Sequence, residues 1–195
     1  MGLRIALDAG HGLYTAGKRV PAYLDDNCTR EWQLNDRICD ILEENLKYYD
    51  CEVLRVDDTS GHVDVSLASR VYSANKFNAD VYLSIHHNAG IAGGTGGGTV
   101  VFYANNSLER RGQAQYLYDK VVDETGLVGN RSQKVVYKTY YVITHTKCPA
   151  FLLENGFMDS RTDINIILSE DHAHKTVNGI MLWLINCWRL EKKKA

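Results

Sequence analysis

The chain has 195 residues, a formal net charge of −2 and 45% hydrophobic residues, which is the composition of an ordinary globular domain. The near-neutral charge argues against a nucleic-acid-binding protein, whose contact surface would be strongly basic. No apolar run approaches the roughly 20 residues that a membrane-spanning helix needs. Met1-Gly2 leads directly into an apolar run, so we expect no signal peptide and no membrane anchor, and a protein made in the cytoplasm.

Strand-like and helix-like segments alternate along the first half of the chain. Short apolar, β-branched runs predict strands at 4–7, 52–56 and 81–85. Apolar residues at three- and four-residue steps predict helices at 30–48, with Thr29 as the N-cap, and at 66–78. Strands that alternate with helices are typical of an α/β domain with a largely parallel sheet.

The second half continues this alternation after the glycine-rich segment 90–98, which we interpret as a flexible lip. Further strands are predicted at 99–103, within 134–143 and at 150–153, and further helices at 107–125, 163–168 and 172–190. We expect a twisted, largely parallel but mixed sheet of about six strands, flanked by helices on both faces. Residues 1–191 would form one domain, followed by a solvated tail at 192–195.

The cysteines predict free thiols rather than a disulfide framework. Their number is odd, their spacings are wide and no C-x-x-C pair occurs. They are Cys28, Cys39, Cys51, Cys148 and Cys187. A metal ion in this chain would therefore be held by histidine and carboxylate side chains.

Three of the predicted strands end in a titratable side chain beside glycine. His11 lies between two glycines after the first strand, His86 ends the strand at 81–85, and Glu154 follows the strand at 150–153. The carboxyl ends of parallel strands meet at one edge of a sheet, where α/β domains place their sites. We expect these three side chains to gather at that edge.

Glu31 falls on the inward face of the first predicted helix, three residues before Leu34 and seven before Ile38. A buried carboxylate requires a cation or hydrogen-bond donors; alternatively, Glu31 is only an acid in the first turn, where the helix dipole favours it. Two imidazoles and one carboxylate are the ligand set of a catalytic zinc. A second carboxylate beside the metal can act as general base, and Glu31 and Glu154 supply one carboxylate for each role.

Five motifs, in a fixed order along the chain, carry a resemblance to a known family. They are Asp8-Ala9-Gly10-His11-Gly12, Glu31-x-x-Leu34-Asn35, Arg70-x-x-x-Ala74-Asn75, Ala79-Asp80-x-x-x-Ser84-Ile85-His86-x-Asn88-Ala89 and Cys148-Pro149-Ala150-x-Leu152-Leu153-Glu154-Asn155-Gly156-Phe157. Together they resemble the zinc-dependent N-acetylmuramoyl-L-alanine amidases of the type-3 family, the cell-wall hydrolases of bacteria and phages. The resemblance spans residues 3 to about 190.

The resemblance implies one Zn²⁺ ion held by His11, Glu31 and His86, with Glu154 as the catalytic carboxylate. It also implies the reaction, which is hydrolysis of the amide between the lactyl group of N-acetylmuramic acid and the L-alanine of the peptidoglycan stem peptide. Water activated by zinc would attack the lactyl carbonyl, and Glu154 would pass the proton of that water to the departing amine.

His87 departs from the family pattern, which commonly has a small residue at this position. Residues on a strand alternate faces, so at most one of His86 and His87 is expected to be a ligand, and the motif selects His86. His87 would then line the substrate groove or pack beneath the helices, and Asn88 and Asn155 are further candidates for substrate contact. Solvated surface positions are expected for the remaining histidines, which are His62, His145, His172 and His174.

Other functions remain open at this stage. Another zinc hydrolase, cutting within the stem peptide, would use the same ligands. A non-catalytic glycan-binding module would have no reason to keep both Glu31 and Glu154 near a metal, and structural zinc sites are usually closed by four cysteine or histidine ligands. The substrate lies outside the membrane, which favours a phage endolysin released through a holin. A bacterial enzyme freed by lysis or a fragment of an exported protein is the alternative, and the tail at 192–195 would begin a linker to a wall-binding domain.

Overall fold

The computed structural model describes residues 2–105, 107–132 and 134–194. Its elements, in chain order, are β1 (Leu3–Ala9), α1 (Glu31–Leu46), β2 (Cys51–Arg55), α2 (Leu67–Phe77), β3 (Val81–Asn88), β4 (Thr99–Tyr103), α3 (Leu108–Thr125), β5 (Val135–Tyr137), α4 (Tyr141–His145), β6 (Ala150–Phe157), α5 (Ile164–Ile167) and α6 (Glu170–Trp188). Among these residues no helix is both long enough and apolar enough to cross a membrane.

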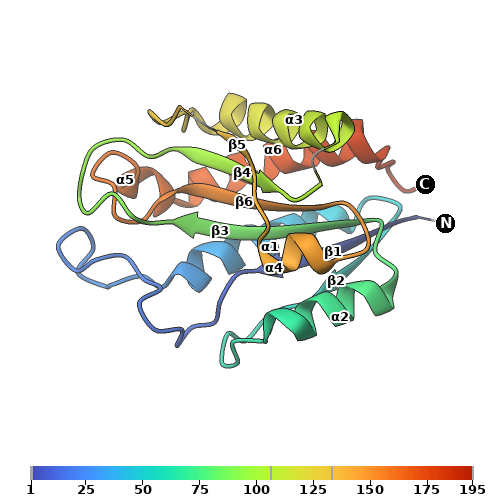
Figure 1. The fold of residues 1–195 in the computed structure, drawn as a ribbon, viewed down its shortest axis with the longest axis horizontal. Coiled ribbons are helices and arrows are strands. Elements are labelled where there is room, and N and C mark those ends of the chain that lie inside the picture. Colours follow the sequence, from blue (N-terminus) through green and yellow to red (C-terminus); the bar gives the residue numbers. More distant parts are fainter. Residues whose placement is uncertain (1, 106, 133, 195) are drawn as a thin grey trace.

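The strands of the described residues form one six-stranded sheet in the order β2-β1-β3-β6-β4-β5 (Figure 1). Strands β2, β1, β3 and β6 run parallel to one another, whereas β4 pairs antiparallel with β6 and carries β5 parallel to itself. The expected mixed, largely parallel sheet is therefore confirmed. Because β1, β3 and β6 run in the same direction, their carboxyl ends lie at the same edge.

Helices cover both faces of the sheet. Helices α1, α3 and α6 contribute to one core cluster, and α2 and α4 contribute to a second cluster on the opposite face (Figure 1). Strand alternation decides which side chain joins which core, since Leu83 and Ile85 of β3 lie in the first cluster and Tyr82 lies in the second. The same alternation places His86 on the α2/α4 face and His87 on the α1/α6 face.

Several element boundaries differ from those expected. Helix α1 begins at Glu31 with Arg30 as its N-cap, whose main-chain N–H donates to Gln33 Oε1 at 2.8 Å, so the prediction of Thr29 as N-cap is wrong. Gly126 ends α3 with a left-handed φ of 71°, as expected. The segment 134–143 contains the short strand β5 but also the start of α4, whose five residues are too few to show a helical period.

The glycine-rich segment has no regular structure, but its backbone is anchored at both ends. The Asp159 carboxylate accepts hydrogen bonds of 2.8 Å from each of three successive main-chain N–H groups, those of Gly90, Ile91 and Ala92. Asp163 does not cap α5 with its side chain and instead accepts from the main-chain N–H of Gly98 at 2.8 Å. The expected flexible lip is thus tied to the segment that follows β6.

The described residues of the tail pair through their backbone with the turn between α1 and β2. Lys192 forms a bridge with Tyr49, and the main-chain N–H of Lys193 donates to the carbonyl of Tyr48 at 3.0 Å. Their side chains are exposed. The five cysteines are free thiols, as expected.

Candidate active site

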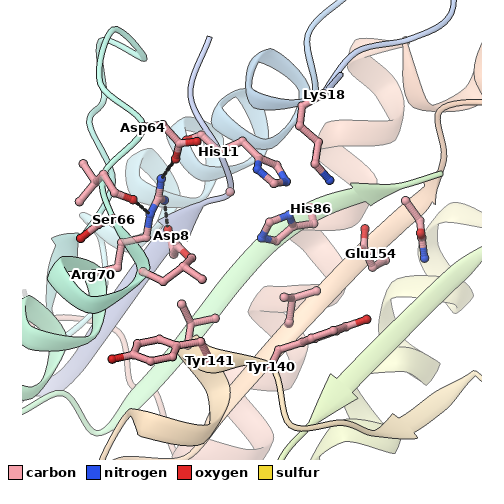
Figure 2. Close-up of a pocket in the computed structure, with 16 residues that line it drawn as sticks. Asp8, His11, Lys18, Asp64, Ser66, Arg70, His86, Tyr140, Tyr141 and Glu154 are labelled. Atoms are coloured by element: carbon pink, nitrogen blue, oxygen red, sulfur yellow. Dashed lines mark hydrogen bonds and ion pairs between the residues drawn. The ribbon is translucent and has the colours of Figure 1, made fainter. Parts of the chain in front are cut away.

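The ends of β1, β3 and β6, together with the start of α2 and the α4 region, line a cleft at the carboxyl edge of the sheet, with a volume of about 630 Å³. His86 and Glu154 are neighbours across β3 and β6, and His11 follows the end of β1. Figure 2 shows His11, His86 and Glu154 around this cleft, with Lys18 beside them and two tyrosines of the α4 region opposite. The sheet therefore gathers the side chains as the sequence predicts.

Glu31, the first residue of α1, meets both imidazoles. Its Oε1 lies 3.3 Å from His11 Nε2 and 3.0 Å from His86 Nδ1, and the donor atoms of all three side chains lie within 4.8 Å of one another. The Glu31 side chain is 1% exposed. Burial alone would raise the pKa of this carboxyl, but hydrogen bonds with His11 and His86 hold the pKa well below its usual range.

The donor set fits a cation. Glu31 Oε2 is buried without a hydrogen-bond partner among the described residues, and its ion pair with Lys18 Nζ, at 3.6 Å, comes from a side chain that is 43% exposed. A buried carboxylate beside two imidazole nitrogens is expensive unless a charge of opposite sign meets it. These three side chains therefore form a candidate metal centre.

Glycine at position 10 makes room for the His86 ring. A Cβ on Gly10 would lie 2.0 Å from His86 Cε1, so no other residue fits there without displacing the imidazole. The Gly10 main-chain N–H donates to the Ile85 carbonyl at 3.0 Å, which fixes the end of β1 beside β3. The following residue, His11, has a left-handed φ of 67°, a conformation that costs a non-glycine residue roughly 1–3 kcal/mol.

Arg70 holds this strained turn from the α2 side. Its guanidinium is 1% exposed, donates to the carbonyl of Ala9 at 2.8 Å and to that of His11 at 2.9 Å, and pairs with Asp8. Tyr82 donates to the same Asp8 carboxylate at 2.7 Å. Burial alone would raise the pKa of Asp8, but Arg70 and the hydroxyl donors lower the pKa below its ordinary value, so the pair stays charged.

Glu154 stands in the cleft as a carboxyl outside the candidate metal centre. Its Oε2 is shielded from solvent and has no hydrogen-bond partner among the described residues. Burial raises the pKa of Glu154 to about 7; the nearby His86 opposes this rise, and the Glu31 charge adds to it. A carboxyl with this pKa can both accept and release a proton near neutral pH, as a general acid–base group must.

Comparison with known proteins agrees with this geometry. The family model for N-acetylmuramoyl-L-alanine amidase matches residues 5–186. The chain belongs to this family. The amidase CwlM of Bacillus licheniformis is 30% identical over 197 residues, which cover 99% of this chain and 72% of CwlM.

Solved structures of the family share the fold. An N-acetylmuramoyl-L-alanine amidase from Clostridium difficile 630 superposes with a TM-score of 0.79 at 26% identity, covering 95% of this chain and 98% of that one. The catalytic domain of CwlV from Bacillus (Paenibacillus) polymyxa has a TM-score of 0.82 at 23% identity, covering 96% and 98%. This chain is thus an enzyme, an amidase that acts on the peptidoglycan of the cell wall.

Of the residues predicted to contact the substrate, only Asn88 lines the cleft of this amidase. His87 is 2% exposed on the opposite face of β3, where its Nδ1 lies 2.8 Å from Asn35 Oδ1, so of its two expected positions it takes the one beneath the helices and not the one in the groove. Asn155 is fully buried, and its Nδ2 donates to the His86 carbonyl at 3.2 Å. Strand alternation turns both side chains away from the cleft.

His172 of the amidase is buried rather than solvated. It is 2% exposed, and its ring centroid lies 6.4 Å from that of His87 beneath α1 and α6. Burial lowers the pKa of His87 to about 3, with His172 adding to the effect, and burial lowers the pKa of His172 to about 4. The other three histidines without a predicted role are exposed, as expected; they are His62, His145 and His174.

Sequence reasoning missed the structural roles of Arg70 and Asp8, although both stand in the quoted motifs. A charged residue directly after the apolar run Ile5-Ala6-Leu7 of β1 and an arginine on the inward face of α2 were the available signals. Each would have indicated a buried partner of opposite charge.

Proposed function

We propose that this amidase is zinc-dependent and hydrolyses the amide between the lactyl group of N-acetylmuramic acid and the L-alanine of the stem peptide. The observation that carries the proposal is the cluster of His11, Glu31 and His86 at the cleft, with the separate Glu154 carboxyl beside it. Nitrogen and carboxylate donors suit Zn²⁺, and three protein ligands leave a coordination position open for chemistry.

The different roles of the Glu31 and Glu154 carboxyl groups follow from their environments. Zinc, when bound to His11, Glu31 and His86, supplies a Lewis acid that polarises a carbonyl and lowers the pKa of water. Glu31 stays ionised and suits a ligand, because its hydrogen bonds favour the charged form. Glu154 suits proton transfer, because burial raises its pKa to about 7. Glu154 would take a proton from the attacking water and deliver it to the amine of the departing L-alanine.

Mass spectrometry of purified muropeptides, incubated with the protein with and without a chelator, tests the proposal. We expect chelator-sensitive release of intact stem peptide with a free N-terminal L-alanine. Cleavage within the peptide would keep the metal centre but reassign the bond, and cleavage unaffected by the chelator would refute the zinc dependence.

Variants separate the two roles. Glu154→Ala should abolish turnover while zinc remains bound, whereas His11→Ala, Glu31→Ala and His86→Ala should each lose zinc affinity as well. A Glu154→Ala protein that lyses walls at the normal rate would overturn the mechanism. Access to the wall through a holin, as for an endolysin, is part of the proposal and is tested by whether lysis from within requires a co-expressed holin.

A further inference from the structure

A buried asparagine links the end of β1 to α1 behind the candidate metal centre. Asn35 is fully buried, and its Nδ2 donates to the Gly10 carbonyl at 3.0 Å. A carbonyl oxygen can only accept a hydrogen bond, so the amide nitrogen of Asn35 must face Gly10. The Oδ1 of Asn35 therefore faces the opposite way, toward β3.

His87 completes this link from β3. Its Nδ1 lies 2.8 Å from Asn35 Oδ1, and because that oxygen only accepts, Nδ1 must carry the proton. The main-chain N–H of His87 also donates to Glu31 Oε1 at 3.3 Å. His87 thus contacts Glu31 directly and Gly10 through Asn35, although its side chain lies outside the cleft.

The position of Gly10 in turn fixes the positions of two of the three candidate ligands, His11 and His86. The His86 ring packs against the Gly10 Cα so closely that a Cβ there would lie 2.0 Å from Cε1. His11 is the next residue in the chain and is held in a left-handed conformation. Metal–ligand distances tolerate shifts of only about 0.2 Å, so a small displacement of the Gly10 carbonyl would separate the two imidazoles from their common target.

We propose that His87 is a positioning residue of the metal centre, which orients Asn35 through its Nδ1–H and thereby sets the Gly10 carbonyl that places His11 and His86. The inference rests on the proposed zinc function. Hydrogen-bonded groups behind metal ligands commonly contribute 10–100-fold to metal affinity. A packing role for His87 would depend on side-chain volume, whereas the positioning role depends on a hydrogen-bond donor at the δ position.

Two variants of His87 separate these roles. His87→Asn keeps an amide N–H at the δ position, and His87→Leu fills similar space without a donor. The zinc dissociation constant, measured by competition with a chromogenic chelator, should rise about 10–100-fold in His87→Leu and stay within about threefold of wild type in His87→Asn. His172→Leu is the matched control, because it removes a buried imidazole from the same layer without touching Asn35, and it should leave zinc affinity unchanged.

The outcomes distinguish the inference from the proposed function. Wild-type protein that binds no zinc would overturn both. If the wild-type protein binds zinc and His87→Leu binds it equally well, only the positioning role is overturned. The same holds if His87→Leu and His87→Asn weaken zinc binding to the same extent. If His87→Leu fails to fold, Asn35→Asp replaces the donor to Gly10 by an acceptor in the same volume. It should weaken zinc binding by a similar factor, and unchanged affinity would refute the link.

Discussion

Replacing Glu154 with glutamine should remove a pH-dependent part of the stability of the metal-free protein. The folded pKa of Glu154 is about 7, raised by burial from 4.5. The folded state therefore binds this proton more tightly than the unfolded state does. The resulting stabilisation is complete below about pH 4.5 and is lost as the pH rises through 7.

The magnitude follows from the rise in the pKa of Glu154 from 4.5 to about 7, which corresponds to about 3 kcal/mol. This is an upper value, because the residue is partly exposed to the cleft. Between pH 5.5 and 8.5 the two-state titration gives a loss of about 2 kcal/mol for the wild type. Glutamine has no ionisable group and should show no such loss.

Urea unfolding in the presence of a chelator, at several pH values from 5.5 to 8.5, measures this effect as the difference between wild type and Glu154→Gln. The subtraction cancels titrating groups common to both proteins. Glu191→Gln, at an exposed position, is the matched control and should change the free energy of unfolding by no more than about 0.5 kcal/mol. A difference between wild type and Glu154→Gln that stays constant over this pH range would refute the raised pKa, and with it the reason for assigning proton transfer to Glu154.

Three further predictions concern the supporting structure. Gly10→Ala should abolish zinc binding in equilibrium dialysis, because its Cβ would lie 2.0 Å from His86 Cε1; retained affinity would show that the ring can move. Gly112→Ala, on the exposed face of α3 with open space around the new methyl group, should raise the free energy of unfolding by about 0.5–1 kcal/mol, and a decrease would contradict this. His172 has its pKa lowered to about 4, so it contributes stability above pH 6.5 that is lost as the pH falls through 4. His172→Leu should flatten the acid side of the pH–stability profile by about 3 kcal/mol, and an unchanged profile would count against a neutral buried imidazole.

The sequence predicts the site well where the prediction depends on strand alternation and strand direction. Both are local or nearly local properties. The apolar run of β3 fixes which side chains share a face, and this separates His86 from His87 before any tertiary contact is known. The alternation of strands with helices predicts that β1, β3 and β6 are parallel, and parallel strands bring His11, His86 and Glu154 to one edge.

The remaining features depend on partners far apart in the chain, which no local pattern reveals. Asp8 and Arg70 are 62 residues apart and pair in the core. Asp159 anchors main-chain groups that lie nearly 70 residues earlier. His172 lies near the start of a helix among polar neighbours, which is typical of an exposed residue, yet the packing of α6 over the sheet buries it. Long-range polar contacts of this kind are visible only once the sheet order is known.

One face of β3 carries the side chain that lines the amidase cleft, and the other face carries the side chains that we propose support it. His86 faces the cleft with Glu154, whereas the His87 and Asn155 side chains lie on the other face, where Asn155 donates to the His86 carbonyl and His87 contacts Asn35. A shift of β3 by one residue would exchange the two faces, putting His87 at the cleft and His86 in the core. The hydrogen bond from Gly10 to Ile85 and the fit of the His86 ring on Gly10 both oppose such a shift. The glycine that makes room for the His86 ring thus also fixes the register that brings His86, the proposed metal ligand, to the cleft.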